Sequence, residues 1–219
     1  MLTIDVRWMD LAGIGTYLSH VVPGILAPFT NDPICLLGST ARLANLPGVD
    51  NPNVQILDVQ SPMYSIREQF EIVQKIPKET KLFFATHYNI PLLYRGRMLV
   101  TVYDVMHLAR YDLVGGLHKW LYAALMLNAT RWRAEAILTI SYFSKGELER
   151  LTFAGKADIH PIHLGVSDDW LTLPAQPRPY EGRYILYVGN VKPHKNLRAL
   201  VHAYTTLAHR IPHDLVIVG

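Results

Sequence analysis

The sequence predicts an α/β protein, in which a complete domain with a parallel sheet precedes the first βαβ unit of a second domain. Short apolar runs recur along the chain, and segments with helical spacing lie between several of them. Strands that alternate with helices form parallel sheets with helices on both faces. Residues 173–182 are rich in proline and have no periodicity, which indicates a linker. We therefore expect an N-terminal domain over 1–172, a linker over 173–182 and a second domain over 183–219.

The N-terminal domain is predicted from its apolar runs and helical patterns. Thr16 is expected to cap the first helix, and Ser144 with Glu147 matches a capping box. The expected strands are 1–6, 34–37, 54–59, 82–85, 98–102, 136–140 and 158–162. The expected helices are 17–26, 65–75, 117–135 and 144–153.

The C-terminal segment predicts a βαβ unit. Buried strands are expected over 184–188 and 214–219, and a helix over 197–208 lies between them. A polar loop that follows Gly189 leads into this helix. Because parallel strands normally belong to larger sheets covered on both faces, the order of elements predicts a domain that is begun and not finished. We expect a C-terminally truncated form of a longer polypeptide.

Composition and charge exclude several classes of protein. Hydrophobic residues make up 50% of the 219-residue chain and charged residues 18%, which favours a folded core over disorder. A net charge of +3 is too weak to indicate a nucleic-acid partner. No apolar run approaches the roughly 18 residues of a membrane-spanning helix. The single cysteine, Cys35, fits a reducing compartment, so we expect a cytoplasmic protein.

Two glycine-containing loops are candidate phosphate sites. Gly13 and Gly15 lie between a strand and a helix, where the backbone can approach an anion at the helix N-terminus. A tight turn is the alternative interpretation and the commoner one. Lys195 precedes the helix of the C-terminal unit, where its ammonium group can meet a phosphate. A solvated loop lysine is the alternative there.

Polar residues follow several of the expected strands. Tyr103 and Asp104 end the strand 98–102, and His107 comes shortly after. His87 follows the strand 82–85, and Ser141 follows the strand 136–140. Side chains at the carboxyl ends of parallel strands point into the crevice where such sheets bind ligands. These residues are therefore site candidates, although a histidine among apolar residues is more often a core residue.

Two further patterns concern metals and membranes. His160 and His163 have no third ligand nearby, so we predict no metal site and no metal cofactor. The helix 117–135 carries Lys119 and Arg133 beside apolar residues, which suggests peripheral contact with the inner face of a membrane. Packing of this helix on the sheet is the favoured alternative.

Several segments of the sequence match those of a known family. They are 4–7 with 13–18, 101–105, 138–145 followed by 163–166, and 187–197. The segments occur in the family's order and are spread over nearly the whole chain, which therefore resembles the retaining family 4 glycosyltransferases of the GT-B fold.

The resemblance implies a GT-B-like architecture, in which two Rossmann-like domains face each other across a cleft. It implies an enzyme that transfers a hexose, such as mannose, from a nucleotide-diphosphate sugar to a lipid-linked or polysaccharide acceptor. No metal is expected, because the fold works without an Asp-x-Asp motif and the sequence contains none. The family's acidic Glu-x7-Glu element is expected beyond Gly219, so we expect no turnover by this chain alone.

The resemblance also implies individual functions. Gly15, Asn190 and Lys195 are expected to bind the donor, with Asn190 at a position where many members have arginine. Tyr103 and Asp104 are the expected catalytic residues. The residues expected to bind the acceptor are Gly13, His87, His107 and Ser141.

Two other functions remain open from the sequence. A non-catalytic module that binds an acceptor or regulates another protein could complete its sheet with a second chain, because residues 216–218 would form an exposed edge. A nicotinamide-dependent oxidoreductase is disfavoured, since neither glycine loop has the Gly-x-Gly-x-x-Gly spacing.

Overall fold

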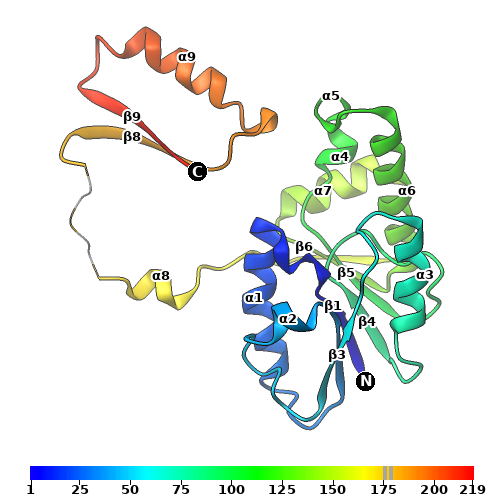
Figure 1. Ribbon diagram of the computed structural model, residues 1–219. Helices are drawn as coiled ribbons and strands as arrows, with labels where there is room; N and C mark the ends of the chain where they lie inside the picture. Colours follow the sequence, from blue (N-terminus) through cyan, green and yellow to red (C-terminus); the bar gives the residue numbers. More distant parts are fainter. Residues whose placement is uncertain (175–176, 178–179) are drawn as a thin grey trace. The chain divides into compact units, whose positions relative to one another are not determined.

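The computed structural model describes residues 1–174, 177 and 180–219. These residues form two compact units, Met1–Ser167 and Asp168–Gly219 (Figure 1). Part of the predicted linker, residues 175–176 and 178–179, lies outside the described residues. The fold is α/β with a seven-stranded parallel sheet flanked by helices, which confirms the predicted fold class and is consistent with a Rossmann-like domain.

The sheet of the first unit has the strand order β3-β2-β1-β4-β5-β6-β7, and every neighbouring pair is parallel. After β1 the chain adds strands on one side and then returns to continue on the other side with β4. The gap between the carboxyl ends of β1 and β4 is therefore the topological switch point, where open α/β sheets bind ligands. The strands are β1 (Leu2–Asp5), β2 (Ile34–Gly38), β3 (Val54–Asp58), β4 (Leu82–Ala85), β5 (Met98–Val102), β6 (Ala136–Thr139) and β7 (Asp158–Pro161).

Helices cover both faces of this sheet, because alternate strand residues belong to two separate apolar clusters. On one face, Leu18 and Val22 of α1 (Ala12–Leu26) pack in a cluster with Ile4 of β1. On the other face, α3, α6 and α7 pack in a cluster with Phe83 and Val100. These helices are α3 (Ile66–Lys75), α6 (Leu117–Arg133) and α7 (Tyr142–Leu151), and the short helices are α2 (Thr40–Leu43), α4 (Met106–Ala109) and α5 (Tyr111–Val114).

The first helix begins earlier than predicted. A 3₁₀ turn, η1 (Arg7–Asp10), follows β1, and α1 starts at Ala12, so both glycines lie in its first turns rather than in a loop. The prediction that Thr16 caps this helix is wrong, because its hydroxyl donates to the Ala12 carbonyl inside the helix. A Cβ on Gly15 would overlap the carbonyl of Met9, so glycine is needed for the close approach of η1 and α1.

The start of α7 also differs from the prediction. Ser141, not Ser144, caps the helix, and its hydroxyl accepts a hydrogen bond of 3.0 Å from the Ser144 amide. Ser144 is buried in the first turn and donates its own hydroxyl to the Tyr103 carbonyl at 2.9 Å. The capping box predicted for Ser144 is therefore wrong. Its side chain joins the first turn of α7 to Tyr103, the residue after β5, instead.

The second unit contains the predicted βαβ element, but its two strands, which were expected to be buried, consist of exposed and half-buried residues. Strands β8 (Arg183–Val188) and β9 (His213–Val218) pair in parallel, and α9 (Leu197–Leu207) connects them. Between β8 and α9 lies a 3₁₀ turn, η2 (Pro193–Lys195), and the helix α8 (Asp168–Thr172) begins the unit. Asn196, with a φ of 50°, is a left-handed residue that redirects the chain into α9.

Candidate functional site at the switch point

The switch point between β1 and β4 is lined by polar side chains. Asp5, the last residue of β1, is in register with Ala85, the last residue of β4. The chain continues from these positions to Arg7 and to His87. Because the two strands are adjacent and parallel, the residues that follow them meet at the same edge of the sheet.

Arg7 is the centre of a buried ionic network. Its Nε and Nη2 atoms donate to the two carboxylate oxygens of Asp5 at 2.8 and 2.7 Å, and its Nη1 atom donates to Glu68 Oε1 at 2.5 Å. The side chains of Arg7, Asp5 and Glu68 are only 5%, 1% and 0% exposed. Burial alone would lower the pKa of Arg7, but the two carboxylates offset this and the net pKa is raised.

The network continues through neutral groups and leaves one oxygen unpaired. Asn89 Nδ2 donates to Glu68 Oε1 at 2.8 Å, and the Tyr122 hydroxyl donates to the Asn89 side-chain oxygen. Glu68 Oε2 is buried and has no hydrogen-bond partner among the described residues. Buried carboxylate oxygens are rarely left unpaired, so this atom is an unsatisfied acceptor within the network.

His87 is a neutral hydrogen-bond donor at this edge. Its Nδ1 atom is 3.1 Å from the backbone amide of Asn89, which can only donate, so Nδ1 is the unprotonated nitrogen. Burial lowers the pKa of His87 to about 3, so the ring is neutral and its proton lies on Nε2. The imidazole is stacked on Trp8 with 4.1 Å between ring centroids. His87 therefore presents a rigid Nε2–H group.

Tyr64 adds an exposed aromatic ring to the same place. It lies in the loop before α3, and its φ of 65° is a strained, left-handed conformation for a tyrosine. The ring lies 5.5 Å from Trp8, 6.2 Å from His87 and 5.9 Å from Tyr122, centroid to centroid, in edge-to-face arrangements. It is still 48% exposed, so one part remains accessible to a ligand. We call Trp8, Tyr64, His87 and Tyr122 the aromatic cluster.

His107 and Asp104 are close to His87 through Tyr88. The Tyr88 hydroxyl is 3.2 Å from His107 Nδ1, and the rings of Tyr88 and His87 are 4.3 Å apart. Asp104 is near enough to contribute to the raised pKa of Tyr88, whose largest cause is burial. Asp104 Oδ1 accepts a hydrogen bond of 2.9 Å from the amide of Met106, the first residue of α4. Its other carboxylate oxygen has no partner among the described residues.

Tyr103 belongs to a neighbouring part of the edge. Its ring packs edge-on against Tyr17 of α1 at 5.4 Å, and its backbone carbonyl is held by Ser144. Burial raises the pKa of its hydroxyl, which has no hydrogen-bond partner in the part of the chain that the structure describes. Ser141 caps the N-terminus of α7, where its hydroxyl accepts a hydrogen bond from the Ser144 amide.

The remaining predicted residues belong to α1 and to the second unit. Gly13 is exposed, and a Cβ placed on it would have no neighbouring atom within 4 Å, whereas Gly15 is buried against Met9. Asn190 and Lys195 are exposed residues of the second unit. Lys195 lies in η2, directly before the N-terminus of α9, as the sequence predicts.

Several residues of the site were not among the sequence candidates. The missed residues are Asp5, Arg7, Trp8, Tyr64, Glu68 and Tyr122. Signals in the sequence could have indicated two of them, Asp5 and Glu68. Asp5 is a carboxylate inside a strand next to Arg7, and charged residues are seldom buried unless they are paired. Glu68 lies four residues before Ile72, so helical periodicity puts it on the buried face of α3.

Comparisons with known proteins add no identification: no family model and no curated protein matches the chain. Within the described residues, no cluster of three metal-ligating side chains is present. None of the helices that the structure describes is both long and apolar enough to span a membrane.

Proposed function

We propose that the chain belongs to a retaining glycosyltransferase, which transfers a hexose such as mannose from a nucleotide-diphosphate sugar to a lipid-linked or polysaccharide acceptor. The observation that carries this proposal is that His107 and Asp104 lie close to His87, a member of the aromatic cluster. These residues lie at the sheet edge where α/β domains bind ligands. Further support is the resemblance of the sequence segments described above.

The chemistry of this edge suits a saccharide. Sugar hydroxyls both donate and accept hydrogen bonds, and His87 Nε2–H offers a donor while the free oxygen of Asp104 offers an acceptor. The exposed part of Tyr64 offers an apolar surface for the C–H face of a sugar ring. In this proposal Asp104 faces the reacting acceptor hydroxyl, the buried Tyr103 beside it supports its position, and Ser141 helps to hold both through Ser144.

The second unit suits the donor. Lys195 is exposed and lies directly before the N-terminus of α9, where backbone amides and a cationic side chain favour phosphate. A cation there would stabilise the negative charge that grows on a departing nucleoside diphosphate. We propose that Lys195 and Asn190 bind the diphosphate of the nucleotide sugar, and we propose no metal for this reaction.

Saccharide binding can be tested by saturation-transfer NMR with a panel of mono- and oligosaccharides. His87→Phe keeps a ring stacked on Trp8 but removes the Nε2–H donor, and we expect it to weaken binding at least tenfold. His160→Phe is the matched control, because His160 is exposed on β7. Equal saccharide binding by the wild type and His87→Phe would contradict the proposed acceptor site.

A specific observation favours a second function, that of a non-catalytic acceptor-binding or regulatory module that another chain completes. In the two-stranded sheet, Leu186, Val188 and Val218 are 52%, 70% and 50% exposed. Exposed apolar strands of this kind are able to pair with another chain. Light scattering over a hundredfold range of concentration discriminates, since a monomer throughout would contradict this alternative.

A further inference from the structure

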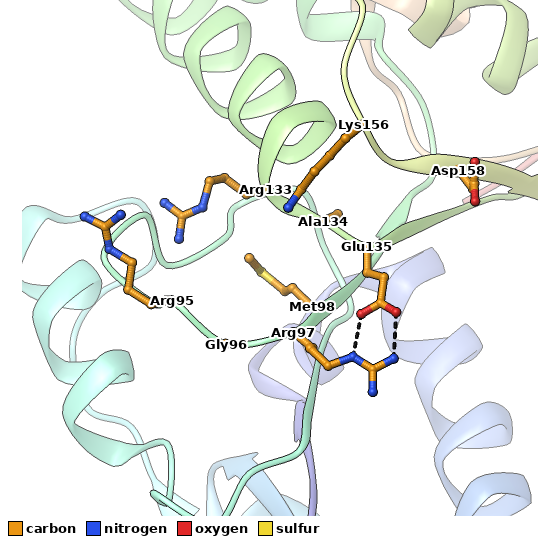
Figure 2. Close-up of a pocket in the computed structure, with 9 residues that line it drawn as sticks. All are labelled: Arg95, Gly96, Arg97, Met98, Arg133, Ala134, Glu135, Lys156 and Asp158. Carbon is orange, nitrogen blue, oxygen red and sulfur yellow. Dashed lines mark hydrogen bonds and ion pairs between the residues drawn. The ribbon is translucent and has the colours of Figure 1, made fainter.

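A second concave site lies at the opposite, amino edge of the sheet. It is lined by the loop before β5, the end of α6 and the first residues of β5 and β7, and its volume is about 590 Å³ (Figure 2). Ligand pockets for small molecules commonly have volumes of about 300–1,000 Å³. The candidate site described above is at the carboxyl edge of the same sheet, so the two are separate.

Cationic side chains dominate this pocket. Arg95, Arg133 and Lys156 come from three different segments and surround one opening, as Figure 2 shows. Arg97 is turned to Glu135 instead and forms a bidentate ion pair with it, at 2.6 Å for both contacts. The charges of Arg97 and Glu135 therefore compensate each other, and the three remaining cations outnumber the one other acid of the lining, Asp158.

The three cations differ in the contacts that their side chains make. Arg133 donates to the carbonyls of Leu92 and Tyr94 and so holds the loop before β5. The side chains of Arg95 and Lys156 make no hydrogen bond or close ion pair with any residue that the structure describes, and both are exposed. Lys156 acts only at longer range, where its charge adds to the larger effect of Arg97 in lowering the pKa of Glu135. Two free cations beside a third, anchored one form an arrangement that attracts a multiply charged anion.

We propose that this pocket binds the diphosphate group of a water-soluble metabolite. A diphosphate has enough oxygen atoms to meet Arg95 and Lys156 together, with Arg133 near both, whereas the pocket is far larger than one phosphate. Met98 and Ala134 also line the pocket, but both are fully buried and expose almost no apolar surface to a ligand. This site does not depend on the proposed transferase function.

The test is calorimetric titration of the whole chain with inorganic pyrophosphate at about 0.15 M salt, where weak surface attraction is largely screened. We expect the double variant R95Q/K156Q to raise the Kd at least tenfold. The matched control K75Q/K119Q removes the same charge from exposed lysines outside the pocket and should stay within twofold of the wild type. Circular dichroism of each variant verifies folding.

A further variant separates this site from the proposed donor site. Lys195→Gln should leave pyrophosphate binding at the pocket unchanged, whereas it should weaken binding of a nucleotide sugar if the proposed function is correct. The pocket proposal is overturned if the wild type does not bind pyrophosphate, or if R95Q/K156Q binds as tightly as the wild type. Equal losses in the K75Q/K119Q control, or a loss confined to Lys195→Gln, would also overturn it.

Discussion

The backbone amide of Asn89 donates to Nδ1 of His87 at 3.1 Å, and this contact fixes which nitrogen of the imidazole carries the proton. The ring is stacked on Trp8 and buried, so the charged form is disfavoured. A neutral, oriented Nε2–H group is a donor for a hydroxyl and is poorly suited to bind a cation. The geometry of these two residues therefore restricts the kind of ligand that the switch point can accept.

The depressed pKa of His87 makes stability depend on pH. Its pKa is about 3 in the folded protein and 6.5 in the unfolded chain. Between these values the unfolded state binds more protons, so the free energy of unfolding falls as the pH decreases, by at most about 1.4 kcal/mol per pH unit from this group. In urea unfolding from pH 7 to pH 4, His87→Phe should show a shallower pH dependence than the wild type and His160→Phe. Parallel curves for all three proteins would contradict a buried neutral His87.

The ionic network predicts a large effect for the loss of its cation. Arg7→Met leaves the carboxylates of Asp5 and Glu68 buried without a counter-ion, and breaking a buried pair in this way costs about 3–5 kcal/mol. Arg97→Met is the matched control, because Arg97 and Glu135 are 68% and 52% exposed and such pairs contribute about 0–1 kcal/mol. Chemical denaturation measures both variants. Similar costs for the two substitutions would show that the Arg7 network is not buried in solution.

Two glycines of the same helix predict opposite responses to alanine. Gly13→Ala should stabilise the protein by roughly 0.5–1 kcal/mol, because the position is open and alanine is the better helix former. Gly15→Ala should destabilise it by about 1–3 kcal/mol, since the new Cβ meets the Met9 carbonyl. Thermal unfolding of the two variants checks the sign of each change. A stabilising Gly15→Ala would mean that η1 does not pack on α1 in this way.

The elements that the sequence predicted best are those with long apolar runs. The strands 82–85 and 98–102 match β4 and β5 at both ends, because their buried residues are continuous and bounded by turn signals. The helix predicted over 117–135 ends at Arg133, since the amide of Glu135 already pairs with Met98 to start β6. Short helices such as α4 were not predicted, because a single turn has no periodicity to detect.

The candidate site was only partly predictable, for a physical reason. His87 and Asp104 lie just after strands, and His107 lies in the short helix that follows β5, so their place at the carboxyl edge follows from local pattern alone. The pairing of Arg7 with Glu68 joins residues 61 positions apart and depends on the packing of α3 beside β1 and β4. No local pattern encodes such a contact. The left-handed backbone of Tyr64 could not be predicted from the sequence either, since tyrosine does not favour that conformation.

Substitution of Tyr64 should affect saccharide binding and protein stability to different extents. The left-handed conformation costs roughly 1–2 kcal/mol for a tyrosine and less for asparagine, so Tyr64→Asn relieves strain while it removes ring packing. We expect the two effects to offset each other, with the free energy of unfolding changed by no more than about 1 kcal/mol. Saccharide binding in the NMR assay should nevertheless fall at least tenfold, because the exposed aromatic surface is lost. Tyr111→Asn, at an exposed tyrosine outside the aromatic cluster, should bind as the wild type does. If Tyr64→Asn retained full binding, Tyr64 would be a structural residue of the loop and not part of a ligand site.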